Sequence, residues 1–122
     1  MGRLFYDEDG MDEENCLKMY NEDYDFYKLV LDTFRQDAQR TLQGMKETFA
    51  SKDVENYRVF VHGLKGAGGS AGAKHLVEMA TESNQLIKDG MVEKAYEYHE
   101  PLIKELERLI RIIPERIASH QD

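Results

Sequence analysis

Apolar residues recur every three to four positions along most of this chain, which is the period of an amphipathic α-helix. The pattern predicts a short helix from about Asp12 to Tyr20, a break at residues 21–25, and then a long helix. The apolar stripe of the long helix consists of Tyr27, Val30, Leu31, Phe34, Ala38, Leu42, Met45 and Phe49. Residues 50–53 interrupt this stripe, and either Ser51 or Asp53 could cap the helix that follows.

The second half of the chain continues the same pattern in three segments. The first would end or bend at Gly72, and its inward residues are Tyr57, Phe60, Val61, Leu64, Ala67 and Ala71. The second would stop near Gly90, with inward residues Leu76, Met79, Ala80, Ser83 and Ile87. The third, residues 92–117, stays in helical register, although Pro101 should kink or restart it and Pro114 could do so again.

No segment shows sustained alternation of apolar and polar residues, and the connections between segments are short. The sequence therefore predicts an all-α fold, an antiparallel up-down four-helix bundle with an additional short N-terminal helix. We expect one domain at residues 12–119, preceded by a loose acidic lead-in at residues 1–11.

Composition narrows the range of partners and settings. The net charge of −8 argues against nucleic acid or an anionic membrane as partner, since both require a basic face. No apolar run approaches the ~18 residues that a membrane span needs. Cys16 is the only cysteine, which excludes an internal disulfide and favours a reducing, cytoplasmic setting. We expect a monomer.

Five of the nine glycines lie between Gly63 and Gly72, beside a single histidine, His62. On a helical wheel His62 points away from the apolar stripe, and Gly68 falls on the apolar side, where it would let another helix approach closely. The residues within about 60° of His62 on the same wheel are Arg58, Val59, Lys65, Gly66 and Gly69. Glycines on this outward side make sense if the backbone of another protein must come close to the imidazole.

A neutral imidazole is a good nucleophile near pH 7, so an exposed histidine can carry a phosphoryl group. Lys65 lies one helical turn beyond His62, where its ammonium group could neutralise that phosphoryl charge. No acid, base or metal-binding cluster stands nearby in the sequence, so a partner would have to supply the metal ion and the in-line geometry. Alternatively, His62 is an ordinary solvated residue of a bundle that docks a partner without covalent chemistry.

The stretch "HGLKGAGGSAGAKHL" resembles the signature of histidine-containing phosphotransfer (HPt) domains, and the likeness extends over roughly residues 12–115. The residues at the signature positions are His62, Lys65, Gly66, Gly72 and Leu76. The resemblance implies that His62 accepts a phosphoryl group from a receiver-domain aspartate, in a response regulator or hybrid histidine kinase, and passes it to another receiver. It also implies a carrier without kinase activity or cofactor of its own, with a divalent metal ion on the receiver.

The chain departs from the family pattern at two places. Ser83 and Asn84 stand where many members carry Leu-Glu; Asn84 could hold the other ring nitrogen of His62 or could equally be a surface residue. Gly63 stands where a threonine or a larger residue is common. The docking surface for the receiver is expected to comprise Arg58, Val59, Gly63, Gly66, Gly69 and Ser70.

Other motifs carry little weight. Residues 66–71, "GAGGSA", fit the dinucleotide-binding pattern G-x-G-x-x-A, but that pattern requires a β-strand before it. Residues 7–14 lack the spacing of a calcium loop, and no P-loop is present. His99 falls on the apolar stripe of the last segment and is expected to be a core histidine. We therefore predict no metal site on this chain.

Overall fold

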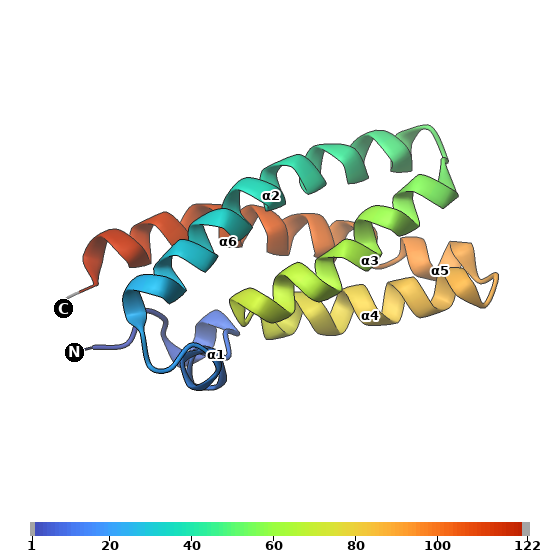
Figure 1. Cartoon of the computed structure of the whole chain (residues 1–122). Coiled ribbons are helices and arrows are strands. Elements are labelled where there is room, and N and C mark those ends of the chain that lie inside the picture. Colours follow the sequence, from blue (N-terminus) through green and yellow to red (C-terminus); the bar gives the residue numbers. More distant parts are fainter. Residues whose placement is uncertain (1, 121–122) are drawn as a thin grey trace.

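Among the residues that the structure describes, four long helices pack side by side, and the other elements are two short helices and one 3-10 turn (Figure 1). This computed structural model describes residues 2–120, with the elements η1 (Asp7–Asp9), α1 (Glu13–Met19), α2 (Tyr24–Ala50), α3 (Val54–Ala71), α4 (Lys74–Lys88), α5 (Val92–Tyr96) and α6 (His99–Ser119). Helices α3 and α6 each contact both α2 and α4, so the four long helices close around one core. Helix α1 lies across the end of the bundle where α2 begins and α3 ends (Figure 1). The predicted all-α bundle with an N-terminal helix is confirmed.

The helix boundaries follow from residues that the sequence pattern singled out. The Asp53 side chain, rather than that of Ser51, caps α3 by accepting a hydrogen bond from the Asn56 N–H at 3.2 Å. Gly72 and Gly90 follow α3 and α4 with φ of +78° and +76°, a conformation that costs glycine little. At both sites two backbone hydrogen bonds close the helix end in the Schellman pattern, as in Ala73 N–H to Gly68 O at 2.8 Å.

The core is made by the predicted apolar stripes, and two glycines let α3 approach its neighbours closely. A Cβ added to Gly44 of α2 would lie 2.3 Å from the ring of Phe60, and one added to Gly68 would lie 2.9 Å from Val77 Cγ2 on α4. The role predicted for Gly68 in internal packing is confirmed. Between residues 2 and 120, no helix is both long and apolar enough to cross a membrane.

The last predicted segment forms two helices, α5 and α6, because Pro101 ends one helix and starts the next, as expected. A proline ring clashes with the carbonyl four residues earlier, here Glu97, and α5 ends just before that residue. Pro101 then lies in the first turn of α6, where its missing N–H would have had no helical partner. Pro114 does not have the same effect, since α6 continues through it to Ser119.

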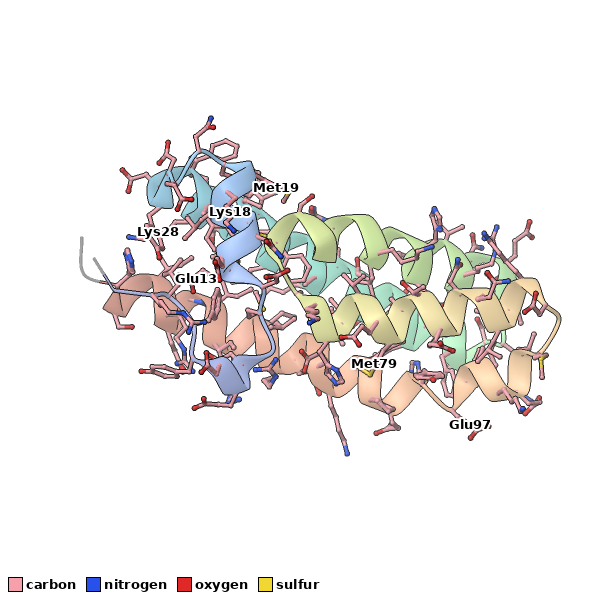
Figure 2. All side chains as sticks on the ribbon, turned by 90° about the horizontal axis from the view of Figure 1, so that it is seen from below. Glu13, Lys18, Met19, Lys28, Met79 and Glu97 are labelled. Carbon is pink, nitrogen blue, oxygen red and sulfur yellow. The ribbon has the colours of Figure 1, made fainter. Side chains whose placement is uncertain are left out.

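The N-terminal segment packs on the bundle, contrary to the loose lead-in that its acidic composition predicted. Leu4 and Phe5 are buried, and their backbone N–H groups donate to the buried carboxylate of Glu13 at 2.9–3.1 Å. Glu13 lies on α1 where the N-terminal segment passes it (Figure 2). Buried Asp9 pairs with Arg116 of α6 at 3.2 Å. Hydrogen bonds and an ion pair of two buried carboxylates thus order a segment that has no apolar periodicity.

His99 is a core histidine, as its place on the apolar stripe predicted. It is buried, its ring stacks on that of Phe49 with centroids 3.7 Å apart, and its Nδ1 lies 2.9 Å from the Tyr57 hydroxyl. Burial lowers the pKa of His99 below its usual value and outweighs the nearby Glu100 carboxylate, which raises it. Folding therefore favours the neutral ring.

We predict that His99 makes the protein less stable in acid. Since its folded-state pKa is lowered, the stability that neutral His99 contributes is present above the unfolded-state pKa, about 6.5, and is lost as the pH falls below it. Urea unfolding of wild type and His99→Gln from pH 7.5 to pH 5 measures this effect, because glutamine cannot be protonated there. The free-energy gap between the two proteins should narrow towards pH 5. Parallel curves would show that His99 titrates alike in both states.

Candidate functional site

His62 lies on the outward face of α3 and is exposed, as the helical wheel predicted. Three residues of the inner face, Tyr57, Val61 and Leu64, are buried against the neighbouring helices. This packing fixes the rotation of α3 about its own axis. The imidazole is therefore held at the surface by residues on the opposite side of the same helix.

Two cationic side chains flank His62 along the helix. Arg58 precedes it by four residues and Lys65 follows it by three, and at these spacings side chains on a helix are neighbours. Across residues 2–120, the side chains of His62, Arg58 and Lys65 form no hydrogen bond or ion pair with another residue. An anion bonded to the ring would thus lie between two available positive charges, although the chain as a whole carries −8.

The outward face beside His62 has little side-chain bulk. A Cβ added at Gly63, Gly66 or Gly69 would meet no atom within 4 Å, whereas one at Gly68 would meet α4. Val59, one turn before His62, is 59% exposed. The outward and inward glycines of α3 therefore have different surroundings, as the wheel predicted, and the imidazole is accessible to a large partner.

A groove between α2 and α3 runs beside this face. It consists of two adjoining hollows of about 370 and 410 Å³ that share Phe34, Asp37 and Ala67. Gly63 lines one hollow and Ser70 the other, so the groove extends from beside His62 to the C-terminal end of α3. The remaining lining residues are Phe26, Leu29, Val30, Thr33, Ala38, Arg40, Thr41, Phe60 and Leu64.

The contribution of α2 to this surface was missed by reasoning from the sequence. Phe26 and Leu29 are 46% and 66% exposed, large apolar residues at the edge of the groove. Both fall outside the apolar stripe that α2 turns to the core. Apolar residues three apart on the polar side of a predicted helix were the signal that could have found them.

Asn84 and Ser83 are buried on α4, so Asn84 is not a surface residue. The Asn84 side chain is 1% exposed, and its Oδ1 accepts no hydrogen bond from the described residues. The Ser83 hydroxyl donates to the Ala95 carbonyl at 3.4 Å. Among the described residues the ring of His62 has no hydrogen-bond partner, so the bond predicted from Asn84 is absent, and Asn84 is instead buried in the core side of α4. Among the same residues, no three His, Cys, Asp or Glu side chains are grouped so that they could hold a metal ion.

A comparison with protein-family models identifies the family to which this helical bundle and its exposed histidine belong. The model of the Hpt domain matches residues 29–112, which include the whole of α3 and α4 and therefore His62 and Lys65. The chain belongs to the Hpt domain family. Hpt domains are phosphocarriers of phosphorelays that interact with receiver domains, which favours phosphotransfer over non-covalent docking as the function of this chain.

A solved structure supports the fold of this Hpt domain. Histidine-containing phosphotransfer protein B from Pseudomonas aeruginosa PAO1 superposes with a TM-score of 0.76 at 21% sequence identity. The match covers 91% of this chain and 97% of that one. A search among curated proteins found no match.

We predict that the glycines of α3 respond to alanine in opposite ways. Gly66→Ala and Gly69→Ala should each raise the free energy of unfolding by about 0.5–1 kcal/mol, because alanine is the better helix former and has room there. Gly68→Ala should lower it, because the new methyl group would force Val77 and α4 away. Chemical denaturation of the three variants tests this. A loss of stability at Gly66 or Gly69 would mean that their outward surroundings are not open.

Proposed function

We propose that His62 is the residue on which this Hpt domain carries the phosphoryl group. The observation that carries the proposal is an exposed imidazole, without a protein partner, between two cations on a face bared by glycines. The position of His62 within the matched family region supports the same assignment. No other histidine of α1–α6 combines these features: His99 is buried, and His75 lies on another helix, α4, beside Gly10 of the N-terminal segment.

In the proposed reaction the Nε2 lone pair of His62 attacks the phosphorus of a receiver aspartyl phosphate. The N–P bond forms as the P–O bond breaks, and the electrons of the broken bond leave with the aspartate carboxylate. The reverse step passes the group to a second receiver. Lys65 and Arg58 lower the cost of the phosphoryl charge.

We assign the divalent metal ion and the in-line geometry of this reaction to the receiver. The chain is then a carrier without kinase activity of its own. The free state of its single cysteine, Cys16, fits a cytoplasmic exchange between receivers of response regulators or a hybrid histidine kinase. We propose that the domain acts as a monomer.

The docking surface for the receiver is proposed to combine the outward face of α3 with the groove along α2. Val59, Gly63, Gly66, Gly69 and Ser70 line the α3 side, and Phe26 and Leu29 add exposed apolar area from α2. An exposed apolar patch with a polar rim is typical of a protein-binding site. Its position beside His62 would bring a receiver over the imidazole.

Replacing the histidine tests the proposed acceptor. We predict that wild type, incubated with a receiver domain phosphorylated by acetyl phosphate, gains phosphate that is labile in acid and stable in base. His62→Gln should gain none, because the amide is not nucleophilic. His75→Gln is the matched control, since His75 is also exposed on a helix, and it should accept phosphate as wild type does. Equal labelling of His62→Gln and wild type would refute the proposal.

Filling the outward face tests the docking surface separately. Gly66→Leu should remain folded, because a Cβ there meets no atom of a neighbouring segment and the position is exposed, but the receiver would have to accommodate four extra carbons. We expect transfer from the receiver to slow by about 5- to 150-fold, the factors that correspond to the about 1–3 kcal/mol that overpacking costs. Direct phosphorylation of His62 by the small donor phosphoramidate should be unchanged.

Lys104→Leu, which adds the same side chain to an exposed position of α6, is the control and should transfer at the wild-type rate. Transfer to Gly66→Leu at that rate would mean that the receiver docks elsewhere.

A further inference from the structure

The C-terminal end of α3 is the part of the helix that its own sequence supports least. Three of its last six residues, Gly66, Gly68 and Gly69, are glycines, which are poor helix formers. A helix also leaves its last carbonyl groups without partners in the helix. This end of α3 nevertheless carries Gly66, Gly69 and Ser70 of the proposed docking surface, so something else must hold it.

Two tyrosine hydroxyl groups supply the missing partners. Tyr20, which follows α1, donates to the Ser70 carbonyl at 2.7 Å, and Tyr27 of α2 donates to the Ala71 carbonyl at 2.7 Å. The backbone N–H of Asp12 adds a third bond, to the Gly72 carbonyl at 2.7 Å. We call these three donors the end clamp of α3. Its bonds join residues 44 to 60 positions apart in the sequence.

The end clamp fits closely against the chain that it holds. A Cβ added to Gly72 would lie 2.8 Å from Cys16 Sγ and 3.2 Å from the Tyr27 hydroxyl, so no side chain separates the two segments. Tyr27 is fully buried, and Tyr20 is half-buried with its ring against that of Phe26, at a centroid distance of 5.1 Å. The end clamp therefore links the end of α3 to the α1 and α2 side of the groove.

The residues of the end clamp all precede residue 29, where the match to the Hpt domain model begins. Ser70 connects the end clamp to the docking surface directly, because it lines the groove and its carbonyl accepts the hydrogen bond from the Tyr20 hydroxyl. His62 lies two turns earlier in α3. That part of the helix is fixed by the Asp53 cap at its start and by the buried residues Val61 and Leu64 on either side of His62. Loosening the end clamp should thus disturb the docking surface and spare the imidazole.

We propose that Tyr20 and Tyr27 are positioning residues for phosphotransfer. Their hydroxyl groups keep the last turns of α3 helical before the receiver arrives, so that Gly66, Gly69 and Ser70 already have the shape that docking needs. Without them the receiver must order these turns itself and binds more weakly. This inference rests on the proposed function of His62 and the surface beside it.

Tyr20→Phe and Tyr27→Phe remove the two hydroxyl groups and keep the rings. Tyr24→Phe is the matched control, because the Tyr24 hydroxyl bonds to Glu13 at 2.8 Å and not to α3. Each protein is measured in three ways: amide hydrogen exchange, phosphorylation by phosphoramidate, and transfer from the phosphorylated receiver that serves wild type best, as a function of receiver concentration.

Both test variants should exchange the amide hydrogens of residues 69–73 faster than wild type, while those in the centre of α6 exchange as before. The receiver concentration that gives half the maximal transfer rate should rise about 3- to 10-fold, because binding must then supply the free energy of the one hydrogen bond that the variant has lost. The maximal rate and the phosphoramidate reaction should stay within about twofold, a smaller change than one such bond produces. Tyr24→Phe should match wild type in all three.

Faster exchange at residues 69–73 with an unchanged half-maximal concentration would overturn the proposal, because the tyrosines would then only stabilise the fold. Unchanged exchange would overturn it as well. Tyr20→Phe carries the test if Tyr27→Phe, which leaves a buried carbonyl unpaired, does not fold. Failure of wild type itself to take phosphate from any receiver, with exchange as expected, would instead refute the proposed function.

Discussion

The packing of the inner face of α3 is the interaction on which the rest of this molecule depends. Phe60 sits directly on Gly44 of α2, and Gly68 lets Val77 of α4 approach the backbone of α3. These contacts hold α3 by one side only. The opposite side is free to lack bulk, and a helix that would be unstable alone keeps three open glycines around His62. Stability and accessibility are thus assigned to different faces of one helix.

Positive and negative side chains are also separated, with two cations beside His62 and the buried acids at the N-terminal segment. The chain is acidic overall, yet Arg58 and Lys65 flank the imidazole, and no carboxylate of the described residues pairs with either of them. The buried acids Asp9 and Glu13 act elsewhere, in fastening the N-terminal segment to α1 and α6. A phosphoryl group on His62 would therefore meet local positive charge without a broad basic surface that would also attract nucleic acid.

Periodicity and end signals were enough to predict the helices, their ends at Gly72 and Gly90 and the exposure of His62, and they left the cap of α3 open between Ser51 and Asp53. These features depend on residues within a turn or two of one another. The burial of Leu4 and Phe5, the groove along α2 and the end clamp were not predictable in this way. Each depends on contacts between distant segments, such as Tyr20 with Ser70, which local periodicity does not report. Only the groove has a local sign in the sequence, the apolar residues Phe26 and Leu29 on the polar side of α2.

Mapping the phosphate after transfer from a receiver tests the central claim most directly. Trypsin cleaves after Arg58 and Lys65, so residues 59–65 form one peptide whose only histidine is His62. Mass spectrometry at alkaline pH, where phosphohistidine survives, should find the phosphate on that peptide. Phosphate on residues 75–88 or 95–104, the peptides of His75 and His99, with none on residues 59–65, would contradict the account.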